Sequence, residues 1–203
     1  MRFLALFLLS LSLLQAEPKT YAYRCDDGFG FVVRFEEGRT WLFAPGFGGQ
    51  LLFIEKGPRG GTLYEGDGAV LDFRGRDAAL ILKGETHENC RNDRKRAIWE
   101  DAKLRGVDFR AVGNEPPWIL EITGERLDFY FGYDRRHYRF EASPKSDAQK
   151  RVTRYESKGS KIPFQVILQP GPCADSMADE SYETKVSVTF GGRRLQGCGQ
   201  ALH

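Results

Sequence analysis

The sequence predicts an all-β protein built from two small antiparallel β-barrel-like domains joined by a short helical segment. Three observations carry this prediction. Apolar residues recur with the two-residue period of strands, glycine-rich turns separate these runs at short intervals, and the four cysteines fall as one pair in each half of the chain. Helical spacing is confined to one stretch near the middle.

The first 16 residues have the pattern of a secretory signal. Met1 and Arg2 precede an apolar run over residues 3–14, and a small-residue cleavage pattern ends at Ala16, before Glu17. The run is shorter than the roughly 20 residues of a membrane-spanning helix, and no cysteine follows it to carry a lipid. We therefore expect a periplasmic or secreted protein without stable membrane insertion, with an uncleaved anchor as the alternative.

Residues 17–91 are expected to form the first domain. Phe31, Val33 and Phe35 alternate with Val32 and Arg34, and further strand-like runs cover residues 40–44 and 50–54. Turn residues separate the runs at positions 36–38, 45–49, 57–61, 65–68 and 74–77. About eight short strands follow, and closing them into a small barrel leaves no exposed sheet edge.

A linker helix is expected within residues 92–109, and a second β-domain over residues 110–203. Ala97, Ile98, Ala102 and Leu104 stand among charged residues with the spacing of a short amphipathic helix. Beyond it, strand-like runs are found at residues 119–123, 126–131, 137–141, 151–156, 164–168 and 184–190.

Four cysteines in an exported chain predict two disulfides. Of the three possible pairings, the favoured one joins Cys25 to Cys90 and Cys173 to Cys198, because each half of the chain then has its own covalent link. No two cysteines have the spacing of two to four residues that zinc sites favour, so no metal site is predicted even though His87 lies near Cys90.

Catalysis has no support in the sequence. His87, His137 and His203 have no recognisable nucleophile or metal partners, and no phosphate-binding loop or dinucleotide fingerprint is present. The protein is therefore predicted to be a non-enzyme without catalytic residues and without a cofactor. Its net charge of +2 is small, and no nucleic-acid partner is expected. The sequence leaves the oligomeric state open.

Several residues of the first half recur in the order and spacing of a known family. The half opens with Tyr23, Cys25, Asp26, Asp27 and Gly28, and closes with Cys90. Between them lie two glycine turns, 60–64 with Tyr64 and 74–78 with Arg74, and ten residues separate Tyr64 from Arg74. Over about residues 20–91 the chain resembles the bacterial-envelope inhibitors of c-type lysozyme, the MliC/PliC proteins.

The resemblance implies that the protein inhibits a c-type lysozyme by inserting turn residues into the active-site cleft, which protects the cell-wall peptidoglycan. Such an enzyme works with two carboxyl groups, one a proton donor and one ionised. The family's inserted lysine corresponds to Arg74, which keeps the charge on a longer, planar group. The family's serine corresponds to Gly60, which has no hydroxyl. The residues expected at the inhibitory surface are Gly60, Gly61, Thr62, Tyr64, Arg74 and Gly75.

The second half contains three short motifs, at residues 113–118, 173–177 and 197–199, that resemble a poorly characterised family of exported bacterial β-domains. Some of these domains are fused to lysozyme-inhibitor-like modules, but the family lends no chemistry. Glu115 and Trp118 have the residue types of a sugar-binding spot, although a tryptophan after two prolines is more often a core anchor. The alternative hypothesis is therefore a non-enzymatic protein of cell-envelope maintenance or glycan binding.

Overall fold

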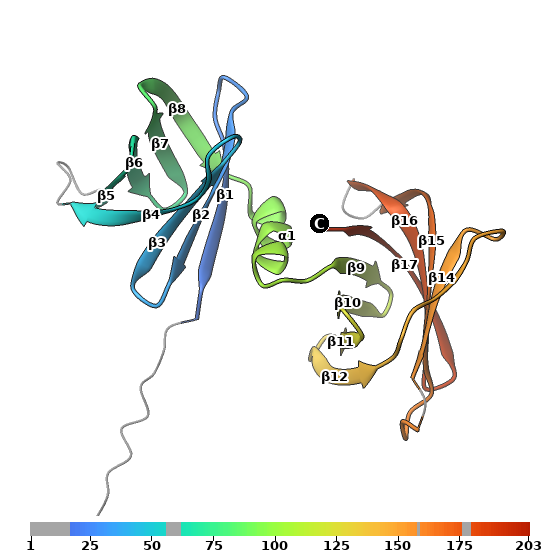
Figure 1. Cartoon of the computed structure of the whole chain (residues 1–203). Helices are drawn as coiled ribbons and strands as arrows, with labels where there is room; N and C mark the ends of the chain where they lie inside the picture. The colour runs from blue at the N-terminus through green and yellow to red at the C-terminus, as the bar shows by residue number, and fades with distance from the viewer. Residues whose placement is uncertain (1–16, 56–61, 158, 176–179) are drawn as a thin grey trace, which may run out of the picture. The chain divides into compact units, whose positions relative to one another are not determined.

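The computed structural model describes residues 17–55, 62–157, 159–175 and 180–203. The expected signal peptide and the expected site residues Gly60 and Gly61 lie outside this part. Contacts divide the chain into two compact units on either side of the Ala97–Ile98 bond (Figure 1).

The first unit is an eight-stranded closed antiparallel barrel, as predicted. Its strands are β1 (Lys19–Arg24), β2 (Gly30–Glu36), β3 (Arg39–Ala44), β4 (Gly48–Glu55), β5 (Thr62–Gly66), β6 (Ala69–Arg74), β7 (Asp77–Leu82) and β8 (Glu85–Asn92). Each strand pairs with the next in the sequence, and β8 returns to pair with β1. Alternate positions point inward, and those that are fully buried include Tyr23, Val33, Leu42, Leu71 and Leu80.

The Cys25–Cys90 disulfide lies next to the seam where the barrel closes. Cys25 directly follows β1 and Cys90 belongs to β8, and these two strands pair only through Tyr23 with Asn92 and Arg24 with Arg91 among the described residues. The covalent link therefore reinforces the shortest pairing of the barrel. The second predicted disulfide, Cys173–Cys198, is also present.

One helix, α1 (Arg94–Leu104), lies within the range expected for the linker helix. It begins at Asp93, whose carboxylate accepts a hydrogen bond from the Arg96 backbone N–H at 3.0 Å, as an N-cap residue does. It ends before Gly106, whose φ of 80° suits a residue without a side chain. Of the helices in the described part of the chain, none is long and apolar enough to cross a membrane.

The second unit contains one nine-stranded antiparallel sheet. Its strands are β9 (Phe109–Asn114), β10 (Pro117–Thr123), β11 (Arg126–Phe131), β12 (Arg136–Glu141), β13 (Lys145–Asp147), β14 (Val152–Ser157), β15 (Phe164–Asp175), β16 (Glu180–Phe190) and β17 (Arg193–Ala201). Their order across the sheet is β12-β11-β10-β9-β17-β16-β15-β14-β13, so β12 and β13 form the edges. The predicted all-β fold is confirmed.

Phenylalanine side chains fill the core on one face of this sheet. Phe140 of β12 stacks on Phe164 of β15 with ring centroids 3.9 Å apart, although these strands are far apart in the sheet order. Phe129 and Phe190 also pack against Phe164 and against each other. The sheet is therefore strongly curled around its own apolar face.

Candidate functional site

The β6–β7 turn is built for a tight reversal of the chain. Arg74 pairs with Asp77 across the hairpin, which leaves Gly75 and Arg76 as its two turn residues. Gly75 has a φ of 76°, a conformation in which a side chain would be strained. A two-residue turn of this kind matches the twist of the flanking strands.

Two hydrogen bonds from other strands hold this turn. The hydroxyl of Tyr23 on β1 donates to the Gly75 carbonyl at 2.5 Å, and the Asn92 N–H at the end of β8 donates to the Arg76 carbonyl at 2.9 Å. Tyr23 is fully buried and stacks on Phe31. Burial raises the pKa of Tyr23 far above its ordinary value, so the hydroxyl stays protonated and can donate even in alkaline solution. Both turn carbonyls are therefore tied to the barrel.

Arg74 carries its charge at the surface. Its side chain is 61% exposed and binds Asp72, two residues earlier on β6, with Nε 3.2 Å from Oδ1 and Nη2 2.5 Å from Oδ2. The hydrogen bond to Asp72 is the largest cause of a raised pKa of Arg74. A two-point contact of this kind fixes the plane of the guanidinium.

A polar surface pocket of about 520 Å³ adjoins the turn. Charged side chains of both signs contribute to its wall, and the residues that line it are Arg74, Asp77, Ala78, Ala79, Glu88, Asn89 and Arg91. The surface around Arg74 is hence a mixed-charge hollow on β7 and β8.

Tyr64, the other residue expected at the inhibitory surface, is part of the barrel core. It is 8% exposed and packs against Phe35 and Phe73 with ring centroids 5.5 and 6.2 Å apart. Burial raises the pKa of Tyr64, against the opposing effect of hydrogen bonds with Thr40 and Thr62. The hydroxyls of Tyr64 and Thr62 therefore serve the interior of the barrel.

The strand register places the start of β5 beside the Arg74 turn. Thr62 pairs with Phe73, so the first residue of β5 and the β6–β7 turn lie at the same end of the barrel. Two of the six expected residues, Arg74 and Gly75, thus belong to one anchored turn, with Thr62 close to it in the register.

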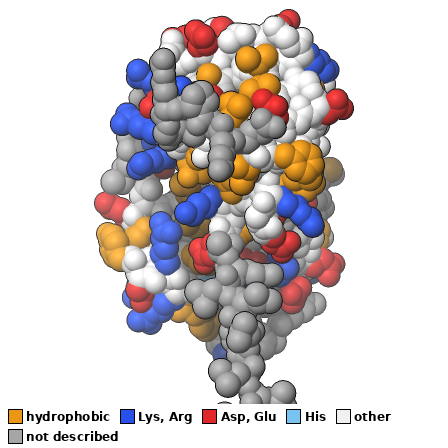
Figure 2. All heavy atoms as spheres, turned by 90° about the vertical axis from the view of Figure 1, so that its left-hand side faces the viewer, with side chains coloured by type: hydrophobic (Ala, Val, Ile, Leu, Met, Phe, Trp, Pro, Cys, Tyr) orange, Lys and Arg blue, Asp and Glu red, His pale blue; other side chains and the backbone are white. Residues whose placement is uncertain are grey.

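An apolar feature near this end of the barrel was not foreseen. Phe53 and Ile54 on β4 are each 66% exposed, and Ile54 pairs with Tyr64, which in turn pairs with Leu71 on β6. Figure 2 shows hydrophobic side chains gathered between charged ones on the face that it presents. The sequence does not predict this exposure. Phe53 and Ile54 belong to an apolar strand-like run, and the run does not show which of its residues lie outside the barrel core.

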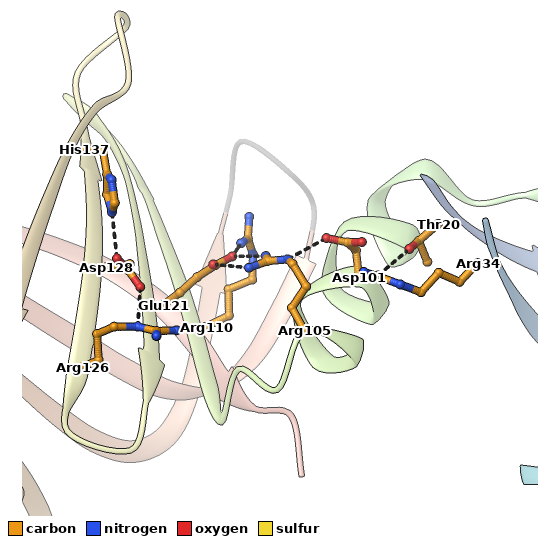
Figure 3. Close-up of polar contacts among 9 residues, drawn as sticks. All are labelled: Thr20, Arg34, Asp101, Arg105, Arg110, Glu121, Arg126, Asp128 and His137. Atoms are coloured by element: carbon orange, nitrogen blue, oxygen red, sulfur yellow. Dashed lines mark hydrogen bonds and ion pairs between the residues drawn. The ribbon is translucent and has the colours of Figure 1, made fainter. Parts of the chain in front are cut away.

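The second unit holds a row of charges across four strands (Figure 3). Glu121 on β10 and Asp128 on β11 are direct cross-strand partners, with Arg110 opposite Glu121 and Arg139 opposite Asp128. The two carboxylate side chains are only 6% and 10% exposed. Like charges placed opposite each other are unfavourable unless cations neutralise them.

Two arginines neutralise Glu121. Arg105 binds it through both terminal nitrogens at 2.9 and 3.0 Å and also contacts Asp101 on α1, while Arg110 forms a short ion pair with it. Burial lowers the pKa of Arg110, which the charge of Glu121 opposes. The guanidinium of Arg110 also lies over the ring of Trp99.

Three basic groups surround Asp128: the Nε atoms of Arg126 and Arg139 and the Nε2 atom of His137 lie 2.8 to 2.9 Å from its oxygens. Burial alone would raise the pKa of Asp128, but hydrogen bonds from Arg139 and His137 outweigh this effect and hold it below the ordinary value. The sequence gives no sign of this row of charges, since Glu121 lies within the apolar run of β10.

Two histidines, His87 and His137, form close contacts with carboxylates. His87 places Nδ1 2.6 Å from Asp27 and stacks on Phe29, and His137 contacts Asp128 as described. Within the described residues, no group of three or more His, Cys, Asp or Glu side chains is arranged to hold a metal ion.

No family model, curated protein or solved structure matches the chain. Its function has to be inferred from its own residues. The two disulfides are compatible with a location outside the cytoplasm, where such bonds persist.

Proposed function

We propose that this protein is an inhibitor of c-type lysozyme that places Arg74 against a carboxylate in the active-site cleft of the enzyme. The observation that supports this most is the β6–β7 turn, which is anchored to β1 and β8 and carries an exposed guanidinium. A turn that is already rigid loses little conformational entropy on binding. The same inhibitor would act in the periplasm or outside the cell.

The contact with Asp72 is compatible with this role. An arginine has five N–H donors, and Asp72 accepts from two of them, the N–H of Nε and one N–H of Nη2. The remaining donors of Arg74 are therefore available to a carboxylate of the enzyme, and Asp72 holds the guanidinium plane while they bind. Arginine is well suited to such planar recognition of carboxylates.

Exposed apolar side chains support a protein partner. Phe53 and Ile54 lie near the same end of the barrel as the turn and offer the apolar contact area that the centre of a protein interface requires. An aromatic or aliphatic anchor beside a charged contact is a common arrangement of interface residues. Tyr64 contributes by supporting the barrel beneath this surface.

The test is a titration of c-type lysozyme activity with the purified chain from Glu17 onward. Wild type should inhibit, and Arg74→Ala should weaken inhibition by about tenfold or more, as the loss of a charge-assisted contact predicts. Arg136→Ala is the matched control, because Arg136 is also exposed and also binds an aspartate two residues earlier, Asp134. It should inhibit like wild type.

Absence of inhibition by wild type would refute the proposed function. Inhibition that Arg74→Ala and Arg136→Ala leave equally unchanged would refute the assignment of Arg74.

A further inference from the structure

A second pocket lies entirely within the second unit, between two hairpin turns. It has a volume of about 380 Å³, within the usual range for small-ligand sites. The strands of the β9–β10 hairpin form one side and the β11–β12 turn forms the other. The lining residues are Val112, Gly113, Asn114, Pro117, Trp118, Ile119, Tyr130, Gly132, Tyr133 and Arg135.

Hydrogen bonds hold the two sides of the pocket in place. The Gly132 N–H donates to the Pro117 carbonyl at 2.8 Å, which joins one turn to the other. The Arg135 N–H donates to the Gly132 carbonyl at 3.1 Å and closes the β11–β12 loop. On the other side, the amide of Asn114 donates to Asp175 at 2.7 Å. The pocket is therefore preformed.

Glycines make room for the aromatic wall of the pocket. A Cβ atom on Gly113 or on Gly197 would collide with the indole of Trp118. Because neither residue has one, the indole lies against the β9 and β17 backbones and is almost fully buried. The closely packed ring of Trp118 thus forms a fixed wall of the pocket.

The rim of the pocket is more exposed to solvent than its interior. Tyr133 is 89% exposed, so its ring has almost no packing partner in the described structure and is available to a ligand. Tyr130 also lines the pocket and is itself stacked on His137. Flat aromatic faces suit the C–H face of a sugar ring, and tyrosine hydroxyls and the Asn114 amide can bind sugar hydroxyls.

Charge narrows the class of ligand further. Among the described lining residues, Arg135 is the one charged side chain, and it is exposed. No carboxylate is among the described lining residues, and the neighbouring Asp134 is paired with Arg136. The guanidinium of Arg135 therefore favours an anionic group, and a carboxylate matches its fork of donors. A fatty acid would leave the polar rim unused, whereas a sugar that carries a carboxylate uses the rings, the rim and the cation together.

We infer that this pocket binds a pyranose that carries a carboxylate group, with the ring against Tyr133 and the carboxylate on Arg135. This site is independent of the Arg74 turn and would make the second unit a binding module for acidic glycans. Glu115 is not among its lining residues, so the pairing of Glu115 with Trp118 suggested by the sequence is replaced by Tyr133 and Arg135 beside Trp118.

The experiment follows the three tryptophan indole N–H signals of the ¹⁵N-labelled chain by NMR, with Trp41→Phe and Trp99→Phe variants to assign them. The probes are glucuronic acid and N-acetylmuramic acid, each with a neutral counterpart, glucose and N-acetylglucosamine. Octanoate serves as a carboxylate without a sugar. We expect both acidic sugars to shift the Trp118 signal and leave that of Trp41 unchanged, with about millimolar affinity.

Variants then separate the two contacts. Arg135→Ala should weaken binding of the acidic sugars about tenfold and should leave that of the neutral sugars unchanged. Tyr133→Ala should weaken both classes, and Tyr133→Phe should retain the stacking. Arg151→Ala is the matched control, because Arg151 is likewise an exposed arginine with positive φ in a hairpin turn.

The inference fails if neither acidic sugar shifts the Trp118 signal, if each neutral sugar binds as tightly as its acidic partner, or if octanoate binds more tightly than the sugars. Unchanged binding of the acidic sugars by Arg135→Ala would also overturn it.

Discussion

The two units use the same chemical pair, arginine with carboxylate, in opposite ways. In the barrel, Arg74 and Asp72 form one exposed pair at the end of a hairpin. In the second unit, Glu121 and Asp128 are neighbours on adjacent strands, are contacted by five basic groups and are almost fully buried. The difference teaches that exposure, more than residue type, decides whether a charge is available to a partner.

Energetics explain the division. An exposed ion pair contributes little to folding because water solvates both partners, so Arg74 can exchange contacts at low cost. A buried carboxylate that loses its cations leaves an uncompensated charge, so the row around Glu121 cannot be opened for binding. The buried row serves the fold, while the exposed pair is free for recognition.

The largest expected effect is that of Glu121→Ala. It leaves the buried guanidinium of Arg110 without its carboxylate, and the free energy of unfolding of the second unit should fall by about 3–5 kcal/mol. Urea denaturation measures this change. Asp72→Ala, the corresponding change in the exposed pair, should leave the unfolding midpoint of the barrel nearly unchanged, and similar losses for both variants would remove the contrast.

The next effect concerns Asp128 and depends on pH. Its pKa is depressed in the folded state, so its stabilising contribution is present above the unfolded-state value of about 4 and is lost as the pH falls through the folded value. Asp128→Asn should therefore cost about 1.5–3 kcal/mol at pH 7. The difference from wild type should shrink as the pH falls below about 4, as denaturation at several pH values can show. A constant difference across this range would contradict the depressed pKa.

A smaller effect is expected from Tyr23→Phe, which removes the hydrogen bond to the Gly75 carbonyl. Stability should fall by about 0.5–1.5 kcal/mol, and inhibition of lysozyme should weaken because the Arg74 turn loses one of its two anchors. Tyr64→Phe is the matched control, since its hydroxyl binds Thr40 and Thr62 rather than the turn. Equal loss of inhibition in both variants would show that the anchor has no special role.

The smallest effect is that of Asp72→Asn. It removes the carboxylate charge that holds the plane of the Arg74 guanidinium, and inhibition should weaken by about threefold because the side chain must then be ordered on binding. Inhibition titrations of the variant beside wild type can detect this change. Unchanged or tighter inhibition would contradict the orienting role of Asp72.

The sequence predicts the barrel well because its signals are local. Each turn of the first unit contains glycine or another turn former, and a two-residue alternation specifies which side chains point inward. The pairing of Cys25 with Cys90 follows from their places at the two ends of one domain. The helix also agrees, since Ala97 and Ala102 lie among charged residues and Asp93 supplies the cap.

The central strands of the second unit were harder to predict. Neither β9 nor β17 was expected as a strand, because Gly113, Gly197 and Gly199 lower the strand propensity of these segments. The structure gives the reason for these glycines: a side chain at Gly113 or Gly197 would meet the Trp118 ring, and one at Gly199 would meet Ala111 and the β9 backbone. The close approaches at Gly197 and Gly199 involve residues about 80 to 90 positions away in the sequence, so they leave no local signal.

The candidate site residues also divide into those that local sequence indicates and those that depend on the fold. Arg74 is a candidate through the resemblance to the inhibitor family, and its exposure is predictable because a turn arginine is exposed wherever the hairpin lies. The burial of Tyr64, the exposure of Phe53 and the clustering around Glu121 all depend on how strands are placed in three dimensions. The apolar run of β10 gives no sign that Glu121, its one carboxylate, is paired with Arg105 just after α1 and with Arg110 on β9.

The most direct measurement is a double-mutant cycle between Arg74→Ala and replacement of each catalytic carboxyl group of a c-type lysozyme by an amide. If Arg74 binds one of these carboxylates, the two changes should be coupled by at least about fivefold in the dissociation constant for that group, with Arg136→Ala showing no coupling. Additive effects of Arg74→Ala with both carboxyl replacements would contradict the account.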